Sequence, residues 1–570
     1  MRNTRTLVLA ATCILLVGLL LGMQVRDAVS SDDPYQNLKK LEEAYSYVTR
    51  NYVDRVDSAD LAEDAILGMI EGLDPHSVYI DAEEMRSVRE NFDASFQGIG
   101  IYYEFIDGQD GQDTLAVLRP IVGGPSEEAG LEPGDRILTI DDTTALGLSS
   151  DLVQRYLKGP KGTQVEVSVR RRGFREPLDF TITRDDIPLN TLVAAHMVDD
   201  ETGYIKLQRF ARTTYDEFMT AMTDLSGQGM ERLIFDLRGN VGGYMGEAVK
   251  IVDEFLPGDE MIVYTDSRHV AYNREYTATP GGTFEGKPVI VLVDENSASA
   301  SEIVAGALQD HDRAVIVGRR TFGKGLVQQQ FQLNDGAVLQ MTISRYYTPS
   351  GRLIQTAYDL GADAEDYYEG KLAVREGEIE AVLESGGSVL PSTDLGAAYP
   401  DSLRFKTDAG RPVFGGGGIL PDYVVVPDSA GATLRTVIRQ SLDSQFARDY
   451  LDATPAFRAE WADRERAFIR EYDLGDDLWQ AFLAYADEQG VPVVDAKPEE
   501  EEGAEAVFVR EQLAAERGDV EARIKAFLAR RLYGVDAFYP VIQEVDRTFQ
   551  EARQLWPAVG DLAEMRASAR

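Results

Sequence analysis

The chain has 570 residues, 44% of them hydrophobic, so it has enough apolar material for several buried cores, and we expect about three to four domains. Its 97 acidic against 57 basic residues give a formal net charge of −40. This excess argues against nucleic acid or anionic lipid as the main partner and fits either a salt-loving host or a generally acidic surface. The single cysteine, Cys13, excludes an intramolecular disulfide and a cysteine-based zinc site.

Residues 1–30 read as a targeting segment. Arg2 and Arg5 precede the uncharged run 6–25, which is long for a signal-peptide core and long enough to span a bilayer. Basic residues before such a run keep the N-terminus in the cytoplasm, so the rest is exported. The small residues "AVS" at 28–30 offer a cleavage site. We expect either a cleaved signal peptide or a single-pass membrane anchor, with length favouring the anchor, and a periplasmic or extracytoplasmic location.

The next two segments differ in their periodicity. Residues 31–92 repeat apolar residues at helical spacing, from Leu38 to the Asp74-Pro75 stop, and predict a helical region. Residues 93–185 are β-rich. Within them, "PSEEAGLEPGDRILTID" predicts a short helix, a tight turn and a strand.

Residues 186–356 alternate apolar strands with amphipathic helices, as in "RLIFDL", "VIVLVD", "SEIVAGALQD" and "AVIVG". Continuous apolar strands between helices predict a sheet covered by helices, so the fold class is α/β within an α+β multidomain chain. Residues 357–404 break this pattern and are interpreted as an insertion, and residues 405–429 hold a strand that returns to the core. Residues 430–570 are mostly charged amphipathic helix, with the acidic run at 497–505 as a loop.

The stretch "GRRTFGKG" nearly matches a phosphate-binding loop, with Gly318, Gly323 and Lys324 in place. Position 325 is glycine, so the metal-binding hydroxyl of that motif is missing. The following "LVQQQFQL" alternates like a strand instead of opening a helix for the phosphate. Both facts argue against nucleotide binding and leave Lys324 as either a loop lysine, the default, or a reactive one.

Three alternating serines, Ser297, Ser299 and Ser301, precede an apolar helix. Ser299 and Glu302 fit a capping box, in which the serine hydroxyl accepts an amide of the first turn. The alternative is a nucleophile at a helix N-terminus, where free amides favour a developing anion. These considerations do not select one serine.

A serine nucleophile needs a base. The four histidines show no triad arrangement, whereas a lysine serves when desolvation lowers its pKa, and Lys324 between apolar strands is the best candidate. The turn "LRGNVGG" after a strand lacks the dinucleotide fingerprint. Its glycines suit an oxyanion hole, because bare backbone amides can face a carbonyl oxygen.

These residues resemble the carboxyl-terminal processing peptidases, the tail-specific serine protease family. The likeness covers roughly residues 40–356 plus "GGGGILPD", and its motifs are "LDPHSVYI", "FQGIGI", "SEEAGLEPGDRI", "DLRGNVGG", "SASASEIVAGALQD" and "TFGKGLVQ". The family uses a Ser-Lys dyad 25 residues apart, which implies Ser299 and Lys324, with Gln328 holding the lysine. The resemblance implies that the backbone amides of the oxyanion hole are those of Ala300 and Gly242, with Gly243 as a possible contributor.

The β-rich region resembles a PDZ domain, whose loop captures a peptide's C-terminal carboxylate and adds the peptide as a strand. The alternative is that Gly98 and Gly100 only form a β-bulge. The neighbouring "GLEPGDRI" favours the PDZ interpretation, and the core would resemble the crotonase- and ClpP-like fold. The implied peptide-binding residues are Phe96, Gln97, Gly98, Ile99, Gly100 and Ile101.

The resemblance implies a membrane-associated serine endopeptidase that cleaves exported proteins near their free C-termini, without metal or cofactor. The alternative is a non-catalytic module that captures tails on the same fold. Residues 357–404 and 430–570 lie outside the minimal family pattern, and for them we consider homo-oligomerisation or substrate gating.

Overall fold

The structure is a computed structural model that describes residues 33–106, 113–121, 123–361, 364–396, 399–428, 431–496 and 506–569. The targeting segment with Cys13 and the acidic run 497–505 lie outside the described residues. The chain divides into two compact units, Met1–Tyr79 with Asp359–Ala362, and Ile80–Tyr358 with Asp363–Arg570. Among the described residues, no helix is both long and apolar enough to cross a membrane.

The described part of the first unit contains helices α2 (Pro34–Asn51) and α3 (Ser58–Ile70), as the helical periodicity predicts. Each begins at an aspartate whose carboxylate accepts an amide of the first turn: Asp33 from Tyr35 N at 3.0 Å, and Asp57 from Ala59 N at 2.8 Å. These caps fix where the helices start.

Within the second unit, the β-rich region forms an antiparallel sheet in the order β3-β4-β5-β7-β8. Its core is apolar and includes Ile99, Val117, Val153 and Val167. The elements of this region are α4 (Glu84–Asp93), β2 (Ser95–Gly98), β3 (Ile101–Ile106), β4 (Thr114–Pro120), α5 (Pro125–Ala129), β5 (Arg136–Ile140), β6 (Thr143–Thr144), α6 (Ser150–Leu157), β7 (Gln164–Arg170), β8 (Leu178–Thr183) and β9 (Asp185–Pro188).

The core is a sheet of seven strands in the order β10-β11-β12-β15-β16-β22-β19. Strands β11, β12, β15, β16 and β22 run parallel, and β10 and β19 pair antiparallel at its two edges. Its members are β10 (Leu192–Met197), β11 (Thr202–Leu207), β12 (Arg232–Asp236), β15 (Val289–Val293), β16 (Val315–Gly318), β19 (Val389–Pro391) and β22 (Tyr423–Val425). Strand β22 is the returning strand that the sequence predicts.

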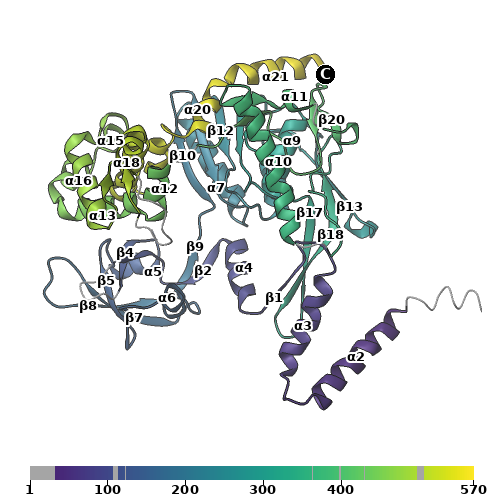
Figure 1. Cartoon of the computed structure of the whole chain (residues 1–570), viewed down its shortest axis with the longest axis horizontal. Coiled ribbons are helices and arrows are strands. Elements are labelled where there is room, and N and C mark those ends of the chain that lie inside the picture. The colour runs from purple at the N-terminus through teal and green to yellow at the C-terminus, as the bar shows by residue number, and fades with distance from the viewer. Residues whose placement is uncertain are drawn as a thin grey trace, which may run out of the picture. The chain divides into compact units, whose positions relative to one another are not determined.

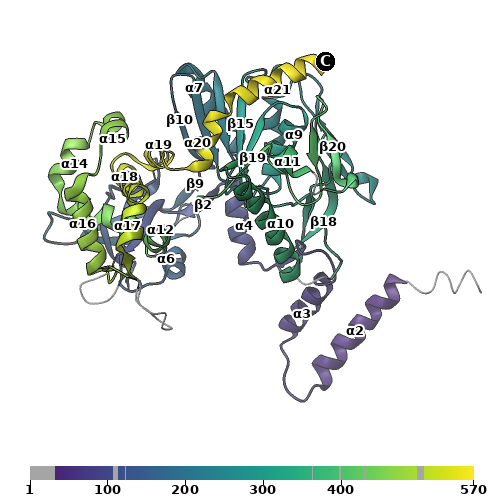
Figure 2. The ribbon, with the colours of Figure 1, turned by 45° about the horizontal axis from the view of Figure 1, so that its top comes forward.

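Helices cover both faces of this sheet, which confirms the α/β class. Helices α7 (Thr214–Gly227), α8 (Met245–Asp253) and α9 (Ala300–Asp310) share a core with Phe235 of β12. On the other face, α20 (Arg547–Gln554) and α21 (Trp556–Ala569) pack near Ile234, the preceding residue of the same strand. Both views in Figures 1 and 2 show α20 and α21 running along the sheet.

A second, antiparallel sheet contains β13 (Met261–Asp266), β14 (Arg274–Thr277), β17 (Leu326–Gln332) and β18 (Val338–Tyr347). Strand β17 begins two residues after Lys324 and pairs with β18. The segment after Lys324 is therefore a strand, as the alternation of its side chains predicts, and not the helix that a phosphate loop requires.

The remaining elements are strand β1, at the boundary of the two units, and those of the insertion, the C-terminal region and short connections. They are β1 (Val78–Ile80), η1 (Val270–Tyr272), α10 (Ala364–Glu384), α11 (Ser392–Leu395), η3 (Asp401–Leu403), β20 (Arg404–Lys406), β21 (Pro412–Phe414), α12 (Ala432–Arg439), α13 (Leu442–Ala453), α14 (Pro455–Trp461), α15 (Glu465–Glu471), α16 (Gly475–Glu488), β23 (Val493–Val494), β24 (Phe508–Val509), α17 (Arg510–Ala515), α18 (Arg517–Tyr533), η4 (Val535–Ala537) and α19 (Phe538–Ile542). The insertion thus supplies both a long helix and an edge strand of the core sheet.

His196 of β10 makes the fold sensitive to acid. Its ring packs against Tyr204, its Nε2 lies 3.0 Å from Gln543 Oε1, and burial lowers its pKa to about 4. The unfolded chain, with an ordinary histidine pKa, binds more protons than the folded chain between about pH 6.5 and 4, so this group removes stability as pH falls through that window.

We predict that His196→Phe flattens the fall of the thermal midpoint between pH 6.5 and 4.5. An unchanged slope would contradict this assignment.

Candidate active site

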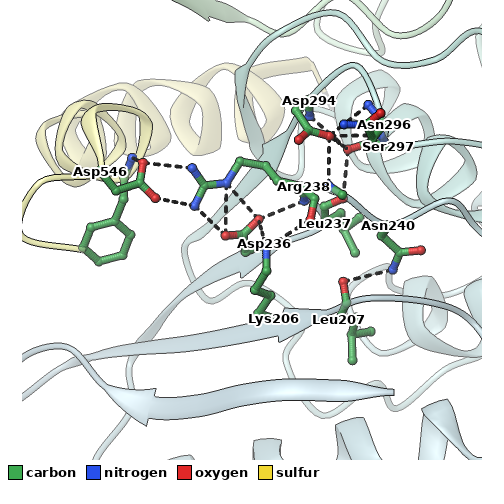
Figure 3. A network of polar contacts seen from close by, with 12 residues as sticks. Lys206, Leu207, Asp236, Leu237, Arg238, Asn240, Asp294, Asn296, Ser297 and Asp546 are labelled. Atoms are coloured by element: carbon green, nitrogen blue, oxygen red, sulfur yellow. Dashed lines mark hydrogen bonds and ion pairs between the residues drawn. The ribbon is translucent and has the colours of Figure 1, made fainter. Parts of the chain in front are cut away.

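A network of charged residues fixes the end of β12 (Figure 3). Asp236 is fully buried, and its carboxylate contacts Arg238 at 2.6 Å, Lys206 at 3.4 Å and the Tyr204 hydroxyl at 2.7 Å. Burial alone would raise the pKa of Asp236, but the charges of Arg238 and Lys206 hold it well below its usual range. Arg238 also donates to Asp546, at the start of α20, at 2.7 and 2.9 Å.

The glycine-rich turn that follows β12 is held by Asn240, which is fully buried. Its side-chain amide donates to the Leu207 carbonyl at 3.1 Å, and its Oδ1 accepts the Gly242 amide at 2.9 Å. Its own carbonyl accepts the Ala298 amide at 3.0 Å and the Ser301 hydroxyl at 2.9 Å. The side chain and the backbone carbonyl of Asn240 thus join the glycine turn to the segment around the three serines.

Glycine is required at position 242 because the two segments approach so closely. A Cβ built there would lie 2.6 Å from the Ala298 carbonyl oxygen and 2.9 Å from the Ser299 Cβ, and Gly242 has a φ of +95°. The glycine turn therefore lies directly against Ser299.

The three serines have different environments. Ser297 and Ser301 are fully buried, and their hydroxyls donate to the carbonyls of Leu237 (2.8 Å) and Asn240. Ser299 is half-buried at the N-cap of α9, with a φ of +53° that is unusual for a side chain with a Cβ. The structure thus assigns backbone-binding roles to the outer serines and leaves Ser299 beside the glycine turn.

Glu302 connects Ser299 to Lys324. Its carboxylate is fully buried, and burial raises its pKa, opposed by four donors. One oxygen accepts the amides of Ser299 at 2.8 Å and Lys324 at 2.9 Å. The other accepts the Gly323 amide at 2.7 Å and the Thr321 hydroxyl at 2.6 Å. The predicted capping box is present, and the same carboxylate also binds the loop that carries the lysine.

Lys324 is half-buried, and its Nζ donates to Gln328 Oε1 at 2.7 Å. The Tyr346 hydroxyl, which is buried, lies 3.0 Å from the Ser299 carbonyl oxygen and 2.5 Å from that of Lys324. The loop fits only because Gly323 flanks the lysine: a Cβ there would meet Thr356 Oγ1 at 2.4 Å. The hydrogen bond expected of Gln328 is thus present.

The amides predicted for the oxyanion hole lie in different settings. The Gly242 amide is already bound by Asn240 Oδ1 at 2.9 Å. Gly243 bridges to Phe210, and a Cβ at Gly243 would lie 2.0 Å from the Phe210 carbonyl oxygen. Ala300 opens α9, and the first amides of a helix have no partner within it. The position of the Ala300 amide at the start of α9 suits a developing oxyanion, and the oxyanion-hole roles of Gly242 and Gly243 stay predictions.

The predicted peptide-binding loop spans two strands. Phe96, Gln97 and Gly98 lie in β2, which pairs with β9. The Ile99 carbonyl accepts the Ser126 hydroxyl at 2.7 Å, and Gly100 has a φ of +74°, so the loop turns there into β3. Ile101 begins β3, an edge strand of its sheet. An edge strand is the element that accepts an added peptide strand.

Comparison with known proteins identifies the family. The sequence profile of peptidase family S41 matches residues 201–363, and that of the PDZ domain matches residues 117–171. A carboxy-terminal-processing protease from Bartonella bacilliformis is 36% identical over 330 residues, which are 57% of this chain and 74% of the relative.

The chain belongs to peptidase family S41.

Other comparisons found further similarities. The carboxy-terminal processing protease CtpB of Bacillus subtilis is 34% identical over 56% of this chain and 65% of the relative. The solved photosystem II D1 C-terminal processing protease is 30% identical over 55% of this chain and 89% of its own, with a TM-score of 0.31. A profile for the N-terminal domain of the activating protease CtpB matches residues 22–84, and one for a family of unknown function matches residues 433–534.

This serine peptidase carries a PDZ domain, and its relatives named as proteases favour the enzyme over a non-catalytic tail-binding module. The histidines of the unit that contains Ser299 are bound elsewhere. His196 contacts Gln543, His269 contacts Arg268 at 3.1 Å, and His311 caps α9 at its far end and contacts Asp408 at 2.7 Å. These contacts agree with the absence of a histidine triad in the sequence pattern.

Four roles in this site were not predicted from the sequence. They are the roles of Asn240, Tyr346 and Asp236, and the contact of Glu302 with the lysine loop. The sequence predicts Glu302 only as a capping residue. Local spacing identifies the capping box, but it does not reveal that Glu302 also accepts the amide of Lys324, 22 residues away. The "FDLRGN" motif contains Asp236 and Asn240, so its polar residues were the available signal for those two.

We predict that Glu302→Gln lowers the free energy of unfolding by about 2–4 kcal/mol, because a neutral amide presents an N–H group to donors that now share a carboxylate. Chemical denaturation and peptide hydrolysis measure the effect, and we expect cleavage to fall as well. Glu295→Gln is the matched control. Glu295 pairs with Arg319 at 2.7 Å near the surface, and its loss should cost about 1 kcal/mol or less. Equal stability of the two variants would contradict the role of Glu302.

Proposed function

We propose that this peptidase is an endopeptidase of the Ser-Lys type that binds free C-terminal tails through its PDZ domain and cleaves exported proteins near those tails. Ser299 is the nucleophile and Lys324 the general base. The observation that carries the proposal is the single carboxylate oxygen of Glu302 that accepts the backbone amides of both residues. That contact holds the start of α9 and the lysine loop together.

The chemistry follows from this arrangement. Neutral Lys324 removes the Ser299 hydroxyl proton while Oγ attacks the substrate carbonyl carbon. The oxyanion forms beside the Ala300 amide, at the positive end of the α9 dipole. The C–N bond breaks, the ammonium of Lys324 gives its proton to the leaving amine, and an acyl-enzyme remains. Water, deprotonated by the same lysine, hydrolyses the ester. Gln328 keeps Nζ in place through its 2.7 Å hydrogen bond.

Substrate delivery uses the PDZ domain. A free carboxylate binds at the loop 96–101, and the tail adds to the edge of β3. The N-terminal targeting segment supports a periplasmic or extracytoplasmic location, with the chain held at the inner membrane or released from it by cleavage at residues 28–30.

We predict that Ser299→Ala and Lys324→Arg each lower kcat/KM for a peptide with an apolar free C-terminus by about 10³-fold or more. Arginine keeps the positive charge but does not lose its proton, so Lys324→Arg separates a general base from a mere cation. Peptide hydrolysis followed by mass spectrometry measures the rates. The amidated peptide should be cleaved more slowly than the free acid.

Ser301→Ala is the matched control, since it removes a neighbouring serine whose hydroxyl binds the Asn240 carbonyl. It should retain cleavage. EDTA should leave the wild-type rate unchanged, and loss with EDTA would indicate a metal mechanism. Activity in Ser299→Ala, or full activity in Lys324→Arg, would refute the proposed dyad.

A further inference from the structure

Helix α10 lies in the insertion, immediately beyond the part of the chain that the S41 profile matches, which ends at residue 363. One face of α10 is buried and includes Tyr367, Lys371, Glu378 and Val382. Only Val382 of these is aliphatic, and it joins the apolar cluster around Phe414. A buried helix face that is mostly polar and aromatic needs specific partners.

Those partners are successive residues of the lysine loop, residues 319–325. Glu378 accepts two N–H groups of Arg320, at 2.6 and 2.8 Å. The Nζ of Lys371, whose pKa burial lowers to about 7, lies 3.4 Å from the centre of the Phe322 ring. Later residues of α10 contact earlier residues of the lysine loop, so the helix and the loop run antiparallel and the start of α10 lies toward the Lys324 end of the loop.

The contact nearest Lys324 passes through Gln355. Its side-chain oxygen accepts the Gly325 amide at 2.9 Å, and its amide nitrogen donates to the Tyr367 hydroxyl at 3.1 Å. Tyr367 is the first residue of the buried face. The first turns of α10 thus support the residue that directly follows Lys324.

Arg375 lies between these contacts and reaches two loops. Its Nη2 donates to the Thr321 carbonyl at 3.0 Å and approaches the Glu295 carbonyl at 3.4 Å. Thr321 belongs to the lysine loop, and Glu295 belongs to the segment that leads to Ser299. The guanidinium of Arg375 therefore joins the segment that leads to Ser299 with the loop that carries Lys324. Glu302 joins the same two regions from α9, whereas Arg375 does so from the insertion.

We propose that α10 holds the lysine loop in position and that Arg375 is a positioning residue for the reaction. The part of this inference that concerns cleavage rests on the proposed function. Arg375 touches backbone carbonyls and not the reacting atoms, so it acts on where Lys324 lies relative to Ser299. A small displacement of a catalytic group lowers the rate of the chemical step much more than substrate binding.

The test compares Arg375→Ala with Glu376→Ala, its exposed neighbour on α10. We expect Arg375→Ala to lower kcat by about tenfold or more while KM changes by less than about threefold. Glu376→Ala should match the wild type in both. Arg375→Lys should recover part of kcat, because both carbonyls accept from the same nitrogen, Nη2, and a lysine ammonium also carries several N–H donors on one nitrogen, although at the end of a shorter side chain. If kcat stays at the control value, or if only KM changes, the positioning role is wrong.

Hydrogen exchange supplies a readout that does not need cleavage. Peptides covering residues 319–325 should exchange faster in Arg375→Ala than in Glu376→Ala, while those covering β12 should not differ. Should Arg375→Ala fail to fold, Arg375→Gln takes its place with the same expectation, because its neutral side chain is shorter and its amide does not reach as far as the guanidinium. Unchanged exchange in residues 319–325 would overturn the inference. If the wild type cleaves no peptide, the proposed function fails, and the exchange result alone still decides whether α10 holds the loop.

Discussion

The buried carboxylate of Glu302 is the interaction on which the site depends. A carboxylate without exposure to water is costly unless its oxygens are satisfied, and here four donors satisfy them. The donors come from two segments that the chain brings together only on folding, the start of α9 and the lysine loop. A conformation in which those segments separate while Glu302 stays buried is therefore penalised, because the carboxylate loses its donors without gaining water. The positive φ of Ser299 fits this constraint, because strained backbone persists where the surroundings determine it.

A second buried carboxylate, that of Asp236, sets the other side of the site. It orients Arg238, which in turn binds Asp546 at the start of α20. The glycine turn that lies against Ser299 is thus tied to the C-terminal helices on the opposite face of the sheet. This gives part of the C-terminal region a structural role in the core.

The local features were accessible from the sequence, and the long-range ones were not. Continuous apolar strands that alternate with amphipathic helices predicted the α/β core, and the spacing of Ser299 and Glu302 predicted the capping box. The strand after Lys324 was predicted from the alternation of its side chains. The contact of Arg238 with Asp546 joins residues 308 positions apart, and no local pattern signals it. Helix α10 was missed because its buried face carries Tyr367, Lys371 and Glu378, so hydrophobic periodicity does not reveal it. Local sequence patterns alone do not choose among the three serines; the spacing implied by the family resemblance chooses Ser299, and the coordinates add that the hydroxyls of Ser297 and Ser301 bind backbone carbonyls.

The central claim is that Ser299 attacks the substrate and becomes acylated. Its most direct test is to mix the full-length protein with a peptide that has an apolar free C-terminus, quench the reaction in acid within its first turnover, and locate the acyl group by peptide mapping. The account predicts an ester on Ser299, and none on Ser297 or Ser301, whose hydroxyls bind the Leu237 and Asn240 carbonyls. An acyl group on either of those serines, or cleavage that continues at the wild-type rate in Ser299→Ala, would contradict it.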